Sequence, residues 1–308
     1  MPVSRDTPGD RVLSLWQDLA DTDMLPPQWL EDTVRHVTPL AINIAGLHAR
    51  QQRPLVVGIN GAQGTGKSTL AKAIALMLEN KFHLKTTVVS LDDFYLSHAS
   101  RQHLGQTVHP LLVTRGVPGT HDVALALDTL QRLRQGNDDV VLPGFDKAND
   151  DCIAEADCGR VRAPRDIIIL EGWCIGVQPQ PEAELTAPVN PLELNEDSDG
   201  RWRRYVNHCL AADYQDLFAD IDYLIMLKAP SFDCVLAWRS LQESKLAAKL
   251  ADHQQLAAKI MTPDAIHRFI QHYERLTRHS IATLPAQADT VLYLDTDHRI
   301  HPCEPELH

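Results

Sequence analysis

Short apolar runs recur along the chain and predict strands that are buried on both faces. The plainest are residues 55–59 (Leu-Val-Val-Gly-Ile) and 167–170 (Ile-Ile-Ile-Leu). Runs of this kind are typical of parallel strands that are covered by helices on both sides. Further strands are predicted at 86–91, 140–142, 221–227 and 291–294.

Helical periodicity fills the stretches between these runs. In residues 28–50, apolar side chains such as Val37, Ala41 and Ile44 recur at a spacing close to 3.6 residues. Pro39 lies inside this stretch and is expected to kink or split the helix. The other predicted helices cover 9–20, 66–80, 121–135, 231–250 and a stretch from 263 onward. This alternation of strands and helices predicts an α/β fold.

The last predicted helix begins with a clear start signal, because Thr262 can serve as the N-cap and Pro263 as the first helical residue. Its apolar residues share one face. We expect its arginines Arg268, Arg275 and Arg278 to lie elsewhere, on the surface.

Residues 178–204 differ in composition from the rest of the chain, because proline and acidic residues dominate them. Predicted strands continue after this segment. We therefore interpret it as a surface insertion within one fold and not as a boundary between domains.

Composition excludes several classes of protein. The chain has 308 residues, of which 41 are acidic and 29 are basic, giving a formal net charge of −12. This balance argues against a general nucleic-acid binder.

No apolar run approaches the ~20 residues of a membrane-spanning helix, and the start of the chain lacks a secretory signal. The six cysteines show no metal-binding spacing. We expect a cytoplasmic protein with reduced thiols and no membrane partner.

Residues 61–68 (Gly-Ala-Gln-Gly-Thr-Gly-Lys-Ser) match the P-loop or Walker A pattern in full, between a predicted strand and a predicted helix. Glycines allow backbone N–H groups to converge on phosphate oxygens. Lys67 supplies charge to the β- and γ-phosphates, and Ser68 ligates Mg²⁺. The motif predicts ATP or GTP with Mg²⁺. The candidate nucleotide-binding residues are Gly61, Ala62, Gln63, Gly64, Thr65, Gly66, Lys67, Ser68 and Thr69.

Carboxylates follow two of the predicted strands. Asp92 and Asp93 come directly after residues 86–91, and Glu171 closes the run 167–170. Ligands of open α/β sheets bind at the carboxyl ends of strands. A carboxylate there can take the proton of an attacking hydroxyl, and Glu171 is placed to bind Mg²⁺.

Two polar loops offer groups for a second substrate. Residues 114–122 contain Arg115, which can clamp a carboxylate in bidentate fashion, and Asp122, which can accept from hydroxyls. The alternative for Thr120 or Asp122 is a helix cap. Residues 145–147 (Phe-Asp-Lys) form the other polar loop. The candidate acceptor-binding residues are Asp93, Tyr95, Arg115, Thr120, His121, Asp122, Asp146 and Lys147.

Together these motifs resemble the D-glycerate 3-kinase family of P-loop kinases and, more distantly, uridine kinase and pantothenate kinase. The resemblance runs in order from about residue 55 to 280. The segments that carry it are 61–68, 91–96, 115–122, 145–147, 171–176, 238–243 and 272–277.

The resemblance implies a doubly wound parallel sheet with helices on both faces and a helical lid at about 231–280. We interpret the chain as one kinase domain at 51–308, with the insertion at 178–204, preceded by a helical extension at 1–50. Among single residues, the resemblance implies that Asp92 is the catalytic base, with Asp93 as the runner-up, and that Arg239 on the lid approaches the transferred phosphoryl group. The alternative for Arg239 is a surface pair with Glu243.

Our leading hypothesis is an ATP-dependent kinase that phosphorylates a hydroxyl of a small acid, with D-glycerate as the first candidate. In this reading Asp92, Lys67 and Arg239 are the catalytic residues, and Ser68 and Glu171 hold Mg²⁺. One alternative is a kinase for a nucleoside or a pantothenate-like acceptor. Another is an ATP-binding regulatory protein without transferase activity. Nothing in the sequence specifies an oligomeric state.

Overall fold

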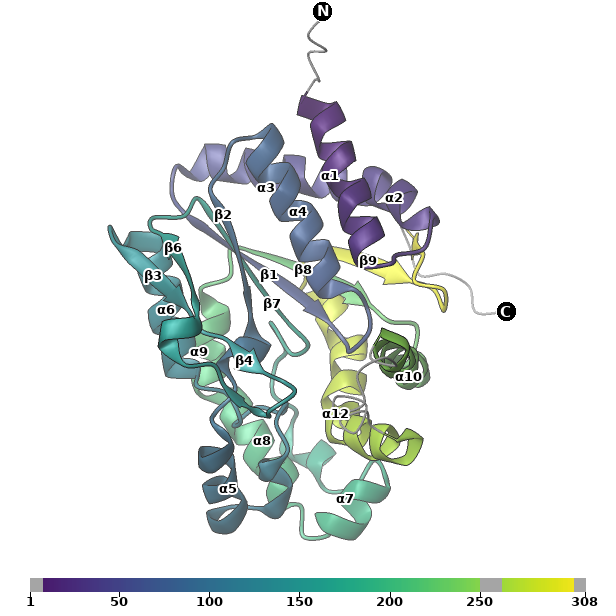
Figure 1. Cartoon of the computed structure of the whole chain (residues 1–308). Coiled ribbons are helices and arrows are strands. Elements are labelled where there is room, and N and C mark those ends of the chain that lie inside the picture. The colour runs from purple at the N-terminus through teal and green to yellow at the C-terminus, as the bar shows by residue number, and fades with distance from the viewer. Residues whose placement is uncertain (1–7, 250–261, 302–308) are drawn as a thin grey trace, which may run out of the picture.

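The fold is built on a mostly parallel sheet (Figure 1). The computed structural model describes residues 8–249 and 262–301. Within them the main sheet has the strand order β10-β9-β8-β1-β7-β2; β10 is antiparallel to β9, and all other neighbours are parallel. Its strands are β1 (Leu55–Gly61), β2 (Thr86–Ser90), β7 (Ile167–Gly172), β8 (Tyr223–Lys228), β9 (Thr290–Leu294) and β10 (Ile300–His301). The first five of these strands coincide with predicted runs.

Alternating side chains of β1 pack into two separate cores, one on each face of the sheet. Leu55, Val57 and Ile59 pack with α1, α3 and α4, whereas Val56 faces the core that α6 and α9 complete. All seven residues of β1 are buried, as a strand covered on both faces requires. The predicted doubly wound fold is therefore confirmed. The covering helices are α1 (Pro8–Thr22), α3 (Thr38–Gln51), α4 (Lys67–Lys81), α6 (Val123–Gln135) and α9 (Asp213–Ala219).

The helices ahead of β1 are part of the main core. Trp16 is 1% exposed, and its indole N–H donates to the carbonyl of Ala73 on α4 at 2.9 Å. The predicted helix at 28–50 is split into α2 (Gln28–Asp32), a π-helical turn (Thr33–Val37) and α3. Pro39 occupies the first turn of α3, where its missing N–H costs no hydrogen bond.

Two small antiparallel pairs stand beside the main sheet. The strand predicted at 140–142 exists as β3 (Asp139–Leu142), but it pairs with β6 (Gly159–Arg162) outside the main sheet. β4 (Phe145–Asp146) pairs with β5 (Asp151–Cys152) and forms a short hairpin. The helix α5 (His98–Thr107) was not predicted.

The insertion at 178–204 is not a purely superficial segment. It contains α7 (Pro191–Glu196) and runs into α8 (Arg201–Ala211). Glu193 is 0% exposed and Asp197 is 1% exposed. The expectation that this acidic segment lies on the surface is therefore wrong for these two residues.

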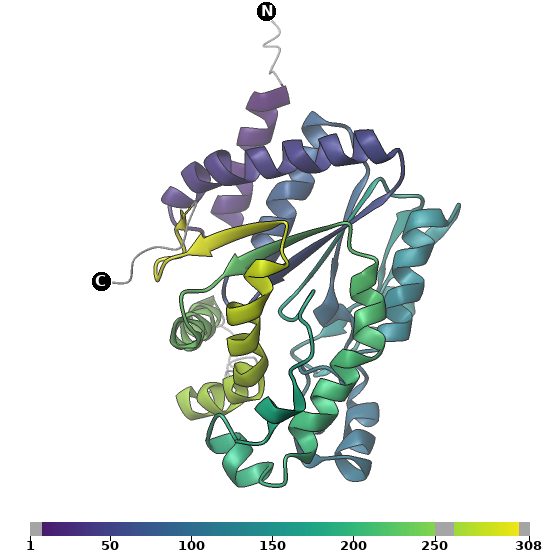
Figure 2. The same ribbon diagram turned by 180° about the vertical axis from the view of Figure 1, so that it is seen from behind.

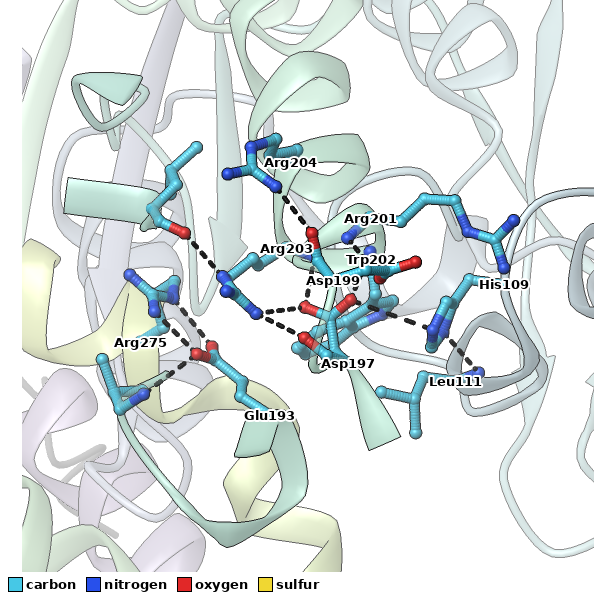
Figure 3. A network of polar contacts seen from close by, with 12 residues as sticks. His109, Leu111, Glu193, Asp197, Asp199, Arg201, Trp202, Arg203, Arg204 and Arg275 are labelled. Atoms are coloured by element: carbon cyan, nitrogen blue, oxygen red, sulfur yellow. Dashed lines mark hydrogen bonds and ion pairs between the residues drawn. The ribbon is translucent and has the colours of Figure 1, made fainter. Parts of the chain in front are cut away.

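Each buried acid of the insertion has a buried arginine as its partner (Figure 3). Arg275 donates to both carboxylate oxygens of Glu193, at 2.6 and 2.7 Å. Arg203 contacts Asp197 at 2.8 Å. Arg275 was expected on the surface, but it is only 8% exposed. That expectation is wrong because the insertion folds over Arg275 and supplies its counter-charge.

Two long helices form the predicted lid region, α10 (Phe232–Lys249) and α12 (Pro263–Thr283). Both helices pack against the cores, α10 through buried Val235 near its start and α12 through buried Tyr273 and Leu276. Figure 2 shows α12 descending from the sheet toward the insertion. No helix in residues 8–249 or 262–301 is long and apolar enough to cross a membrane.

The buried pair between Glu193 and Arg275 should contribute strongly to stability. Glu193→Gln leaves the Arg275 guanidinium buried without a counter-charge, so we expect it to lower the free energy of unfolding by about 3 kcal/mol. The matched control is Glu196→Gln, which breaks the exposed pair with Arg268 one turn away and should cost under about 1 kcal/mol. Urea unfolding measures both, and equal losses would contradict the assignment.

Candidate active site

A cleft of about 410 Å³ opens where β1, β2 and β7 end. This is the edge of an open α/β sheet at which ligands bind. The cleft brings together residues from segments far apart in the sequence. It is lined by Gln63, Gly64, Lys67, Ser68, Ser90, Asp92, Asp93, Tyr95, Arg115, Lys147, Glu171, Trp173, Arg239, Phe269 and Tyr273.

The P-loop connects β1 directly to α4. Gly64 and Gly66 have φ values of 84° and 87°, a backbone conformation that favours glycine. A side chain on Gly64 would also collide with Trp238, because its Cβ would lie 2.7 Å from the Trp238 Cβ. Thr65 ties the loop together by donating to the carbonyl of Ala62 at 2.8 Å. The loop has the form of a phosphate cradle, with its backbone presented at the start of α4.

Glu171 lies at the end of β7, beside the P-loop, and is 3% exposed. Its Oε1 accepts a hydrogen bond from the Ser68 hydroxyl at 2.7 Å, and its Oε2 lies 3.9 Å from Lys67 Nζ. Oε2 is buried without a hydrogen-bond partner among the described residues. A carboxylate oxygen left open beside a hydroxyl is a donor set that fits Mg²⁺, which prefers oxygen ligands.

Asp92 faces the same cleft and is held by two hydrogen bonds. Tyr95 donates its hydroxyl to Oδ1 at 2.8 Å, and Lys147 donates to Oδ2 at 2.6 Å. Burial opposes ionisation of this carboxyl, but the charges of Lys147 and Lys67 outweigh it and hold the pKa of Asp92 well below its ordinary value. Asp92 is therefore an anion at neutral pH.

Asp93 differs from its neighbour in the pKa of its carboxyl. Burial raises the pKa of Asp93 to about 6; the nearby Lys147 opposes this shift, and the negative charge of Asp92 adds to it. Adjacent carboxylates with separated pKa values are typical of sites that handle protons. Of the two, Asp92 is the one that stays ionised well below neutral pH and accepts hydrogen bonds from Tyr95 and Lys147.

Arg115 and Lys147 bring positive charge to the side of the cleft away from the P-loop. The Arg115 guanidinium pairs with Asp150 and lies over the Phe145 ring, 5.5 Å from its centroid. Lys147 and Asp150 both belong to the loop between β4 and β5. The β4–β5 hairpin therefore carries Lys147 and, through Asp150, positions Arg115.

Four predicted acceptor-binding residues lie outside the cleft lining. Thr120 is fully buried, and its hydroxyl bonds to the backbone of its own loop at Gly116 and Val117. Asp122 caps α6 by accepting from the Leu125 N–H at 2.9 Å. Asp122 is therefore a helix cap, as the alternative interpretation had it. Because Asp122 does not line the cleft, the cleft geometry gives no support to its predicted contact with an acceptor.

His121 and Asp146 also have structural partners. The His121 ring stacks on Tyr95 and bonds to the Tyr214 hydroxyl at 2.6 Å, and burial lowers the pKa of His121 to about 4. Asp146 accepts from the backbone N–H of Ala148 at 2.9 Å and so shapes the β4–β5 turn. Both residues support the side chains that line the cleft.

Arg239 reaches the cleft from α10, and its guanidinium lies 5.9 Å from the centre of the Phe269 ring. This distance is within the range of a cation–π contact. The alternative pair with Glu243 involves a side chain outside the described part of the chain. Tyr273, which lies in the segment 272–277 of the family resemblance but was not predicted as a site residue, lines the cleft and donates to the Arg115 carbonyl at 3.0 Å.

Arg101 and Asp150 were missed by sequence reasoning. Arg101 is 0% exposed and pairs with Asp150 at 3.0 Å, so it fixes the acid that holds Arg115. No local motif marks either residue, because the contact depends on how α5 meets the β4–β5 hairpin.

A P-loop, a strand-end carboxylate beside it and a second acid in the same cleft define the chain as a P-loop kinase. The uncharacterized kinase mug58 of Schizosaccharomyces pombe is 33% identical over 235 residues, which cover 72% of this chain and 79% of that protein. The chain belongs to this family of P-loop kinases, which is related to D-glycerate 3-kinase. The resemblance seen in the sequence is thus confirmed.

Two further relatives carry the glycerate kinase name. The chloroplastic D-glycerate 3-kinase of Arabidopsis thaliana is 29% identical over 267 residues, covering 81% of this chain and 54% of that enzyme. A solved structure of D-glycerate 3-kinase from Cryptococcus neoformans superposes with a TM-score of 0.72 and 26% identity, covering 86% of this chain and 97% of that one. No family model matches the chain.

The raised pKa of Asp93 predicts a pH-dependent stability. Between pH 3.8 and about 6 the unfolded carboxyl is ionised while the folded one still holds its proton. Stability is therefore lost as the pH rises through this window. Asp93→Asn cannot ionise, so the ligand-free variant should be more stable than the parent at pH 7 and nearly equal to it at pH 4. Urea midpoints at both values test this; a difference that does not change with pH would refute it.

Proposed function

We propose that this kinase transfers the γ-phosphoryl group of ATP to a hydroxyl of a small hydroxylated acid, with D-glycerate as the first candidate. The observation that carries the proposal is the placement of ionised Asp92 in one cleft with Lys67 and Ser68 of the P-loop. A phosphate donor on the P-loop and a hydroxyl at Asp92 would then meet in the same space. The names of two relatives support glycerate as the acceptor.

In the proposed reaction the acceptor oxygen forms a bond to the γ-phosphorus. The bond from that phosphorus to the bridging oxygen breaks, and ADP leaves with the electron pair. The hydroxyl proton passes to Asp92, which is ionised and can receive it. Lys67 and Arg239 place positive charge where negative charge is shared in the transition state.

Ser68 and Glu171 are the residues that would hold Mg²⁺. The ion supplies charge neutralisation between the β- and γ-phosphates when it is bound. The open Oε2 of Glu171 and the adjacent Ser68 hydroxyl support this assignment.

Cationic side chains favour an acidic acceptor over a neutral one. Arg115 and Lys147 line the acceptor side of the cleft, and Arg recognises carboxylates well because of its planar, forked donors. Tyr95 and Tyr273 also line this cleft; their hydroxyl protons go to Asp92 and to the Arg115 carbonyl, so their oxygens can accept a hydrogen bond. A small acid with a free hydroxyl matches these charges and acceptors.

Asp92→Asn should reduce acceptor-dependent turnover by about 10²- to 10⁴-fold, because the general base is removed. The Kd for ATP should change by less than about threefold, since the phosphate cradle is untouched. The matched control is Asp128→Asn on the exposed face of α6, which should leave turnover unchanged. Steady-state kinetics and calorimetric titration measure these values. Near-normal turnover of Asp92→Asn would contradict the assignment of Asp92 as the general base.

An acceptor screen tests the substrate class. We expect acceptor-stimulated conversion of ATP to ADP with D-glycerate and related hydroxy acids, and little with uridine or pantothenate. Activity with uridine alone would reverse this order. Tight ATP binding with no stimulation by any alcohol would favour a regulatory protein instead.

A further inference from the structure

A second cavity lies on the other side of the P-loop. It has a volume of about 800 Å³ and shares Gly64 with the cleft described above. Its walls come from residues 23–37 of the helices ahead of β1, residues 294–300 around the β9–β10 loop, the P-loop with the start of α4, Trp238 and Leu241 of α10, and Leu227 of β8. Thr65, Gly66 and Thr69 of the phosphate cradle face this cavity.

The chemistry of this cavity suits a flat, neutral and hydroxylated group. Trp29, Leu70, Trp238 and Leu241 give it apolar surface. Its acids are Asp23, Asp32 and Asp297; Asp32 is paired with Arg299, and Asp23 with Lys72. Carboxylates in these walls can accept hydrogen bonds from sugar hydroxyls, whereas the cavity offers no surplus of positive charge to a triphosphate among its described lining residues.

We propose that residues 23–37 form the outer wall of a nucleoside pocket, so that the segment ahead of the first strand contributes directly to nucleotide affinity. This inference rests on the proposed function, because it takes the P-loop as the seat of the phosphates. A nucleotide must then extend from that loop into one of two cavities. The cleft with Asp92 has to remain open for the acceptor, which leaves the larger cavity for the nucleoside.

Ion pairs and ring contacts hold the walls of the cavity together. Arg299 donates to both carboxylate oxygens of Asp32, at 2.7 and 2.8 Å, and this links the β9–β10 loop to the N-terminal helices. His298 donates to the carbonyl of Gly64 at 2.8 Å, and its ring lies 4.1 Å from the Trp238 ring. The pocket is thus built around the phosphate cradle and not merely left beside it.

Met24 provides a clean probe of the N-terminal wall. It lines the cavity and is 50% exposed, so its replacement removes no part of the core. Its φ of 50° is left-handed, a conformation that asparagine adopts readily. Met24→Asn therefore removes apolar contact surface while keeping the backbone and the net charge. Leu241→Asn probes the wall opposite, and Leu194→Asn on α7 is the control because Leu194 is 58% exposed and far from the cavity.

The experiment compares two probes by calorimetric titration of the full chain without any acceptor. ATP engages the cradle and the pocket, whereas inorganic tripolyphosphate engages the cradle alone. We expect the parent protein to bind ATP at least about tenfold more tightly than tripolyphosphate. Met24→Asn and Leu241→Asn should each weaken ATP by about fivefold and leave tripolyphosphate unchanged, and Leu194→Asn should change neither.

Three results would overturn the inference: equal affinity of the parent for both probes, no loss of ATP affinity in Met24→Asn, or an equal loss for both probes. A failure of the proposed function looks different. Lys67→Ala would then leave the binding of both probes intact, or the acceptor screen would be negative while the pocket variants still weakened the binding of ATP.

Tryptophan fluorescence provides a second readout. ATP, but not tripolyphosphate, should alter tryptophan emission, and Trp29→Phe should reduce that change.

Discussion

The turn that joins β1 to α4 is the constraint on which the site depends. Its left-handed glycines let the chain reverse from a fully buried strand into a helix whose first residues are Lys67 and Ser68. Because β1 lies between β7 and β8, the turn emerges next to Glu171. The hydrogen bond from Ser68 to Glu171 then links the start of α4 to the end of β7. Asp92, one strand further along at the end of β2, completes the line of polar groups.

Charge pairs position the wall of the cleft that carries Arg115 and Tyr273, much as the glycine turn positions the P-loop. Arg275 anchors the insertion to α12 through Glu193, and α12 carries Tyr273 into the cleft. Arg101 fixes Asp150, which holds Arg115. The Glu193–Arg275 pair stabilises the fold only as a complete pair, because either partner alone would be a buried uncompensated charge. The two buried acids of the insertion, each paired with an arginine, add nothing to the net charge of −12, which therefore comes from other residues.

Local patterns predicted the parts of the molecule that are set by local chemistry. The apolar runs located the parallel strands, and the glycine and lysine spacing located the phosphate cradle, because both depend on neighbouring residues. Contacts between distant segments could not be predicted this way. The burial of Arg275 and the Asp150 link to Arg115 depend on which segments meet in space. The cap role of Asp122 is local, and the sequence had offered it as the alternative to an acceptor contact. The resemblance to a family supplied the order of the motifs but not these partners.

In the reaction that we propose, donor and acceptor meet in one cleft and the phosphoryl group passes directly between them. The most direct test of this proposal is the stereochemical course at phosphorus, followed with ATP made chiral at the γ-position and with D-glycerate as acceptor. Direct in-line transfer predicts inversion of configuration. Retention would contradict the account, because it requires a phosphorylated enzyme residue between two successive transfers.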